Sequence, residues 1–203
     1  MTAKYHHGDL RNALIEVGEK VLREEGVEAF TLRRLTKEVG VSHNAPYRHF
    51  KNRDDLLAAV SERGYWRLRD HVEEGIERHE GHIQEQLMHF SFDYIDFALK
   101  NRHLYPVMFS SNPHLDSEAL IEVMQNALTA FVEIFERGQA AGTLRTDSPL
   151  LQALTLFSLL HGVANVMLAG RFSMPFDGSQ PDVETLVRGL VEVYMGGILA
   201  TNS

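Results

Sequence analysis

Basic side chains are concentrated in one short stretch of the chain, residues 31–53. The stretch holds six Lys or Arg residues and a single acid, Glu38, and it also contains His43 and His49. Guanidinium and ammonium groups bind phosphate through charge-assisted hydrogen bonds, and a clustered excess of positive charge is typical of nucleic-acid-binding surfaces. The chemistry predicted for this stretch is therefore non-covalent binding of a phosphate backbone.

Two short helical patterns joined by a glycine would position these side chains. Thr31 is an N-cap candidate, and the apolar spacing over 32–39 predicts a helix that ends at Gly40, where a tight turn needs a positive φ. Ser42 is expected to cap a second helix, with Phe50 in the core. A short helix, a glycine turn and a polar second helix together predict a helix-turn-helix whose second helix enters the DNA major groove.

Helical periodicity continues to the end of the chain, and no comparable strand alternation occurs. Asn52 and Asp55 resemble a capping box at the start of a further helix. The predicted fold class is all-α. An N-terminal helix-turn-helix domain of three helices is expected at residues 1–55, followed by a second helical domain at 56–203.

Composition narrows the class of protein further. The 203 residues are 44% hydrophobic, which is ample for a core, and the absence of cysteine excludes a disulfide scaffold and a thiol nucleophile.

The start of the chain carries no secretory pattern, so a cytoplasmic protein is expected. The net charge is -8, but residues 1–55 carry +1, so the acidic excess lies in the remainder. The stretch 150–169 approaches the length of a membrane span, but regularly spaced polar residues favour a helix at a protein interface.

No catalytic motif is recognisable, so we expect neither an enzyme nor a cofactor or metal. The alternative is a metal-sensing regulator, because the chain has 11 histidines and His79 and His82 have helical spacing for two ligands. However, Glu77, Glu80 and Glu85 surround that pair, which favours a solvated face. A helical adaptor is a third possibility, but it leaves the basic segment unexplained.

Several motifs stand in a fixed order near the N-terminus. They are Thr-x-Arg-x-Leu at 31–35, Gly-Val-Ser at 40–42, Tyr-x-His-Phe at 47–50 and then a basic residue, Arg53. In these motifs, residues 10 to about 60, the sequence resembles the TetR family of transcriptional regulators.

A weaker resemblance and two departures qualify the match. Leu160-His161-Gly162 looks like the Trp-His-Gly signature of one TetR ligand-domain subgroup, with Leu in place of Trp. Thr36 stands where the family usually has a small Ala packed between two helices, and Pro46 stands where an aliphatic residue is common. Both departures bear on helix packing and leave the polar side chains unchanged.

The resemblance implies a homodimer that binds a near-palindromic operator, usually as a repressor, and is released by a small ligand acting on the C-terminal domain. The candidate DNA contacts are Thr31, Arg33, Arg34, Ser42, His43, Asn44, Tyr47, Arg48, His49, Lys51 and Arg53. Among them, His43, Asn44 and Arg48 are candidates for base edges, since Arg suits guanine and Asn suits adenine. The alternative is that these polar side chains are simply solvated.

Two long apolar helices, 149–169 and 182–199, are the expected homodimer interface, because small residues such as Gly162 and Gly196 let helices approach closely. The effector is expected to be a small apolar or aromatic molecule. Its candidate contacts are Tyr94, Phe97, His103, Met124, Phe131, His161 and Asn165. A methionine and aromatic stripe is also what an ordinary core looks like, and His161 could equally be a buried or interface histidine.

Overall fold

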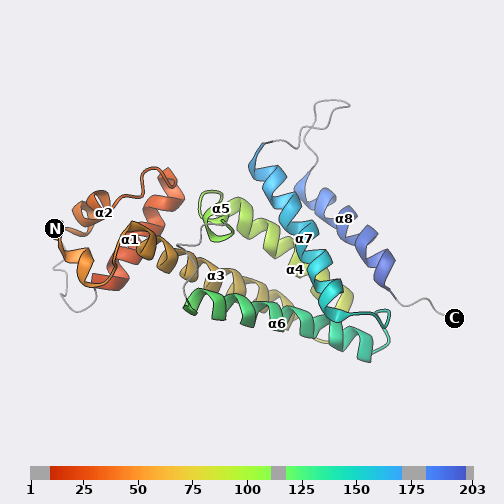
Figure 1. The fold of residues 1–203 in the computed structure, drawn as a ribbon. Coiled ribbons are helices and arrows are strands. Elements are labelled where there is room, and N and C mark those ends of the chain that lie inside the picture. The colour runs from red at the N-terminus through yellow and green to blue at the C-terminus, as the bar shows by residue number, and fades with distance from the viewer. Residues whose placement is uncertain (1–9, 111–117, 171–181, 200–203) are drawn as a thin grey trace. The chain divides into compact units, whose positions relative to one another are not determined.

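The computed structural model describes residues 10–110, 118–170 and 182–199 (Figure 1). The helices in these ranges are α1 (Leu10–Glu25), α2 (Leu32–Val39), the 3-10 helix η1 (Ala45–Arg48), α3 (Arg53–Arg78), α4 (Ile83–Lys100), α5 (Tyr105–Met108), α6 (Glu118–Ala140), α7 (Pro149–Leu168) and α8 (Val183–Ile198). The described ranges contain no strand, and an isolated bridge joins Leu144 to Leu199. The predicted all-α class is confirmed.

Capping side chains explain where several helices begin. The Ser148 side chain accepts a hydrogen bond from the Leu151 N–H at the start of α7, and Pro149 occupies the first turn, where a missing N–H costs nothing. The Asp182 side chain accepts from the Thr185 N–H at the start of α8. The backbone hydrogen bond from Thr185 is the main reason that the pKa of Asp182 is lowered.

The chain forms two compact units. Residues 1–66 and 101–123 make up the N-terminal unit, and residues 67–100 and 124–203 make up the C-terminal unit. This division differs from the domain boundary expected at residue 55, because α3 continues unbroken through that position and residues 101–123 belong to the N-terminal unit. The helices α3 and α6 therefore contribute to both units.

The core of the N-terminal unit lies between α1, α2, η1 and the first half of α3. Its fully buried apolar side chains include Leu14, Leu22, Phe30, Leu35, Leu56 and Val60. A Cβ atom at Gly18 would lie 2.9 Å from a ring carbon of Phe30, so this close approach of α1 requires glycine. The Tyr65 hydroxyl donates a 3.0 Å hydrogen bond to the Met108 carbonyl, which ties α3 to α5, and burial raises the pKa of Tyr65.

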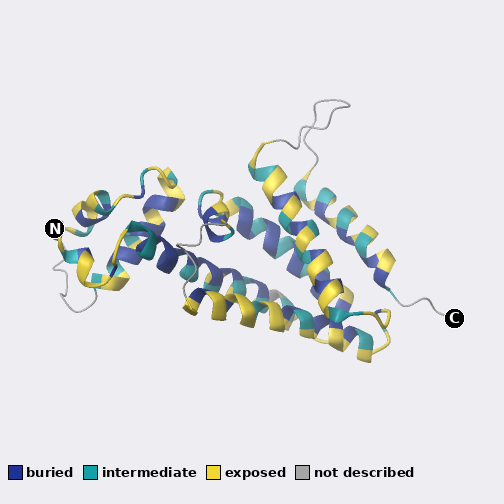
Figure 2. Cartoon of the chain, in the orientation of Figure 1, coloured by how far each residue is buried: buried dark blue, intermediate teal, exposed yellow. Residues whose placement is uncertain are grey.

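The C-terminal unit is built around α4, which packs against α7 and α8 and has few exposed positions (Figure 2). Phe90 of α4 stacks on Phe131 of α6 with ring centroids 4.0 Å apart. The Tyr194 hydroxyl of α8 donates a 2.6 Å hydrogen bond to the Gln152 carbonyl of α7. Aromatic packing between α4 and α6 and the hydrogen bond between α8 and α7 therefore help to stabilise the unit.

Candidate nucleic-acid interface

The turn after α2 has the geometry that the sequence predicted. Gly40 adopts the left-handed conformation with φ of 78°, and its N–H donates to the Thr36 carbonyl at 3.0 Å. The Thr31 side chain caps the start of α2 by accepting from the Arg34 N–H at 3.3 Å. The predicted helix bounds, cap and glycine turn are therefore confirmed, and they fix the direction in which the chain leaves α2.

The element after the turn is shorter than predicted. Ser42 was expected to cap an α-helix, but the chain forms the four-residue 3-10 helix η1 with Asn44 at its N-cap and no side-chain capping bond. The link to Ser42 is instead a backbone hydrogen bond, in which the Ala45 N–H donates to the Ser42 carbonyl. Pro46 sits in the first turn of η1 and is buried, and it has no N–H with which to extend an α-helix from Ser42.

The reading segment, defined as residues 42–51, divides into buried and exposed positions. Phe50 is buried, as predicted, and the Arg11 guanidinium lies 5.6 Å from its ring centroid. Tyr47 is 50% exposed, and its ring meets the His43 ring edge-on at a centroid distance of 6.1 Å. The other exposed side chains of the segment are Ser42, Asn44, Arg48, His49 and Lys51. These exposed polar side chains are thus available for a ligand.

Two candidate contacts are engaged within the chain. Arg34 forms ion pairs with Glu25 at 2.8 Å and Glu38 at 2.7 Å, and the hydrogen bond that its guanidinium donates to Glu38 is the first cause of its raised pKa. Arg53 donates to the Phe30 carbonyl at 2.7 Å and the Val27 carbonyl at 2.8 Å, and it pairs with Asp54 at 3.3 Å. These guanidinium groups hold the α1–α2 connection.

The remaining basic candidates are available for a partner. Arg33, Arg48 and Lys51 are exposed, and none forms a side-chain ion pair within the described residues. The Lys51 backbone N–H donates to Asp55 at 2.8 Å, while the Asn52 side chain accepts from the Asp55 N–H at 2.8 Å. This reciprocal pattern is close to the predicted capping box. Within the described residues, the reading segment therefore carries two cationic side chains without counterions, Arg48 and Lys51, and Arg33 lies nearby in sequence on α2.

The departure at Thr36 has a simple structural solution. Thr36 is buried, and its hydroxyl donates a 3.0 Å hydrogen bond to the Arg33 carbonyl in the preceding turn of α2. A buried hydroxyl is costly only when it lacks a partner. The larger side chain is therefore accommodated without leaving a polar group unsatisfied.

Two of the expected effector residues, Tyr94 and His161, form a polar pair in the C-terminal unit. The Tyr94 hydroxyl and His161 Nδ1 lie 3.2 Å apart, and Tyr94 is buried. Phe157 stacks on the His161 ring at 5.7 Å and meets Tyr94 edge-on. Phe97 and Phe131 are buried in the same unit. Burial lowers the pKa of His161, which favours the neutral imidazole.

The other expected effector residues are placed differently. His103 belongs to the N-terminal unit, where its Nδ1 lies 3.0 Å from the Arg23 carbonyl at the end of α1. Met124 is exposed on α6, and Asn165 is exposed on α7, where its side chain donates to the His161 carbonyl. A pocket lies elsewhere, in the N-terminal unit between α1 and α3, and no sequence motif indicated it.

The histidines proposed for metal sensing do not converge. His79 stacks on His89 with ring centroids 3.8 Å apart, and His82 Nδ1 lies 3.2 Å from the Glu80 carbonyl. Among the residues that the structure describes, no group of three or more His, Cys, Asp or Glu side chains could hold a metal ion. The metal-sensing alternative gains no support.

The fold and the reading segment define a class of protein, the DNA-binding regulators built on a helix-turn-helix. Residues 14–60 match the family described as bacterial regulatory proteins, tetR family, and residues 87–193 match the tetracyclin repressor-like C-terminal domain. The second match covers more than half of the chain. The chain belongs to the TetR family of transcriptional regulators, and it is not an enzyme.

Individual relatives agree with this assignment. An HTH-type transcriptional regulator of Staphylococcus aureus (strain USA300) is 30% identical over 106 residues, which are 52% of this chain and 56% of the relative. The matched region thus spans about half the length of that curated relative. A protein of unknown function from Rhodococcus sp. RHA1 is 32% identical, with a TM-score of 0.84 over 98% of this chain and 100% of the other. A TetR/AcrR regulator from Thermobifida fusca YX-ER1 shares the fold, with a TM-score of 0.69, 20% identity and coverage of 93% and 98%.

Proposed function

We propose that this regulator is a ligand-responsive repressor that binds a palindromic operator as a homodimer. The observation that carries the proposal is the reading segment, in which Tyr47 and Arg48 stand exposed on η1 directly after the Gly40 turn. Tyr47, His49 and Lys51 would contact phosphates, and His43, Asn44 and Arg48 would meet base edges. Action on DNA would place the protein in the cytoplasm.

The engaged arginines take a different part in this proposal. Arg34 and Arg53 would act as positioning residues, because their guanidinium groups already bind the Glu25 carboxylate and the Phe30 carbonyl. The Thr31 hydroxyl oxygen already accepts a hydrogen bond from the Arg34 N–H, so Thr31 would contact a phosphate by donating its O–H. Arg33, which is exposed on α2 without a counterion among the described residues, would supply a further phosphate contact.

The homodimer would form through the outer face of α7 and α8. This face comprises Leu150, Leu151, Leu154, Gly162 and Val166 of α7 with Gly189, Val193, Gly196 and Gly197 of α8, all of them exposed. A Cβ atom added at any of its four glycines would meet nothing within 4 Å, so packing inside this chain does not require glycine at those positions. Close approach of a partner helix would require it.

A membrane is the competing explanation for α7. By length and composition alone, this 20-residue helix is apolar enough to cross a bilayer. However, its Gln152 side chain hydrogen-bonds the Arg145 carbonyl and the Gln139 amide, and its His161 meets Tyr94. Polar groups with specific protein partners favour a protein interface.

The effector would be a small apolar or aromatic molecule that contacts the Tyr94–His161 pair. Support comes from a polar pair set among aromatic rings, since such pairs orient ligands in otherwise apolar sites. The effector would release DNA by binding one arrangement of the dimer more tightly than another, and its differential affinity bounds the effect.

The decisive test is selection of duplexes from a random DNA pool, followed by anisotropy titration of the selected duplex against salt. We expect a palindromic sequence and a steep linear fall of log affinity with log salt, with a slope of roughly -0.9 per neutralised phosphate. Enrichment of no sequence, with affinity no better than for unrelated DNA, would refute operator binding.

A further inference from the structure

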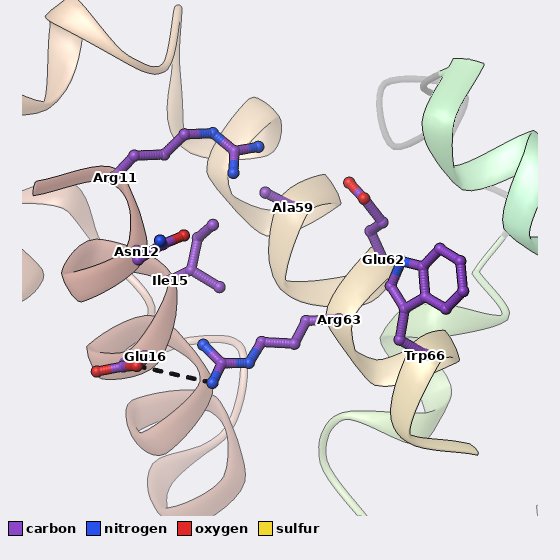
Figure 3. Close-up of a pocket in the computed structure, with 8 residues that line it drawn as sticks. All are labelled: Arg11, Asn12, Ile15, Glu16, Ala59, Glu62, Arg63 and Trp66. Carbon is purple, nitrogen blue, oxygen red and sulfur yellow. Dashed lines mark ion pairs between the residues drawn. The ribbon is translucent and has the colours of Figure 1, made fainter. Parts of the chain in front are cut away.

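A groove of about 320 Å³ lies in the N-terminal unit between α1 and α3 (Figure 3). Its base is apolar and is formed by Ile15 of α1 and Ala59 of α3, which are both largely buried. Charged side chains make up its walls, with Arg11 on the α1 side and Glu62 on the α3 side. The groove thus combines a small apolar surface with charges of both signs.

The charges at one end of the groove are already paired. Arg63 lies 3.7 Å from the Glu16 carboxylate and 3.5 Å from the Glu19 carboxylate, and Glu19 is buried. These ion pairs join α1 to α3 at that end of the groove. Arg63 contributes one positive charge against two carboxylates, so this end of the groove keeps a formal charge of -1 and does not attract an anion.

The charges nearer the other end are not paired. Within the described residues, neither the Arg11 nor the Glu62 side chain has a hydrogen bond or ion pair, although Arg11 lies over the Phe50 ring. Figure 3 shows both side chains flanking Ala59, Arg11 from α1 and Glu62 from α3. An uncompensated cation and an uncompensated anion therefore stand across a small apolar base.

We propose that this groove binds a small zwitterion, an α-amino acid with an apolar side chain. The carboxylate pairs with Arg11, the ammonium pairs with Glu62, and the side chain lies on Ile15 and Ala59. A ligand with one charge would pair with either Arg11 or Glu62 and would leave the other side chain desolvated without a partner, which costs free energy. A ligand with both charges compensates the two together.

The groove is connected to the reading segment through one residue. Arg11 contacts both the groove and the ring of Phe50, which follows His49 in the reading segment. A ligand on Arg11 is therefore expected to alter operator affinity. That consequence rests on the proposed function, whereas binding of the amino acid does not.

The test uses the full chain and three probes that share the leucine side chain: L-leucine, N-acetyl-L-leucine, which keeps only the carboxylate, and L-leucinamide, which keeps only the ammonium. Amide NMR titration reports both the site and the affinity. We expect L-leucine to shift the amides of α1 and α3 around the groove, and to bind roughly tenfold or more tightly than either singly charged probe. Equal binding of the three probes, or no shifts around the groove, overturns the proposal.

Two variants assign the charges. Arg11→Gln should abolish the preference of L-leucine over L-leucinamide, and Glu62→Gln should abolish its preference over N-acetyl-L-leucine. Arg102→Gln and Glu28→Gln are matched controls in the same unit, since both residues are exposed and neither lines the groove. If both groove variants retain both preferences while their circular dichroism stays native, the assignment is wrong. Operator affinity is measured in parallel, so a failure of DNA binding alone counts against the proposed function and leaves this site intact.

Discussion

The reading segment and the outer face of α7 and α8 are both exposed, but they differ in what the fold leaves unsatisfied. In the reading segment, Arg48 and Lys51 lack counterions among the described residues. On the outer face, Val193 is 80% exposed and Gly196 has open space around it. Missing counterions support the charged partner proposed above, and missing apolar neighbours support the proposed contact with a helix of a second copy. Exposure alone would not have distinguished the two surfaces.

The largest expected effect comes from placing charge on the outer face. Leu151→Glu combined with Val193→Glu should give a monomer, because an interface would have to bury two unpaired carboxylates. Operator affinity should fall roughly 100-fold or more, since the second half-site would no longer be bound within the same complex. Sedimentation measures the oligomeric state and anisotropy measures the affinity. Glu122→Gln on α6 is the control, and a surviving dimer would contradict this use of the face.

A smaller effect is expected in the reading segment. Arg48→Ala should cost about 1–3 kcal/mol of discrimination between the selected operator and a duplex altered at one guanine. Tyr47→Ala, by removing a phosphate contact, should weaken binding to both duplexes alike. Competition anisotropy separates the two patterns, with Lys20→Ala on the exposed side of α1 as the control. If Arg48→Ala weakened both duplexes equally, Arg48 would be a phosphate contact.

The contrast between engaged and available arginines can be tested with a matched pair. Arg53→Ala should lower the free energy of unfolding by about 1.5–3 kcal/mol, because two carbonyls lose a charged donor. Arg33→Ala should leave it within about 0.5 kcal/mol, yet reduce the salt slope of DNA binding by about 1. Urea titration and anisotropy measure the two quantities. If the free energy of unfolding were unchanged in Arg53→Ala, Arg53 would not be a positioning residue.

The smallest effect concerns pH. Burial lowers the pKa of His161 below its unfolded value of 6.5, so the unfolded chain takes up a proton first as the pH falls. The stability contributed by the neutral imidazole is present above pH 6.5 and decreases as the pH falls from there toward the folded pKa. His161→Phe should therefore flatten this part of the stability curve. Urea titrations across this range test it, and an identical slope in the variant would show that other groups dominate.

Local signals were sufficient for much of the fold. The cap at Thr31, the turn at Gly40 and the buried Phe50 follow from rules that act within a few residues, and all were predicted correctly. The shortness of η1 was missed because the sequence prediction did not count the hydrogen bond to the Ser42 carbonyl that Pro46, which has no N–H, cannot donate in an α-helix capped at Ser42.

Long-range contacts account for the rest. Arg53 binds carbonyls 23 and 26 residues earlier in the chain, and His103 meets a carbonyl 80 residues earlier, which no local pattern reveals. The Arg34–Glu38 pair could have been anticipated from its four-residue spacing, but the pair with Glu25 could not. The groove residues Arg11 and Glu62 likewise lie far apart in sequence and come to line one groove only in the folded unit.

The bridge between Leu144 and Leu199 joins the end of α8 to the connection between α6 and α7. The Arg145 N–H donates a 2.7 Å hydrogen bond to the Ile198 carbonyl, and Leu144 covers Gly138 closely. A chain truncated after residue 195 would lose the bridge and this hydrogen bond. The connection between α6 and α7 should then become an early site of proteolytic cleavage. Reporter fusions that begin beyond residue 199 would preserve the bridge.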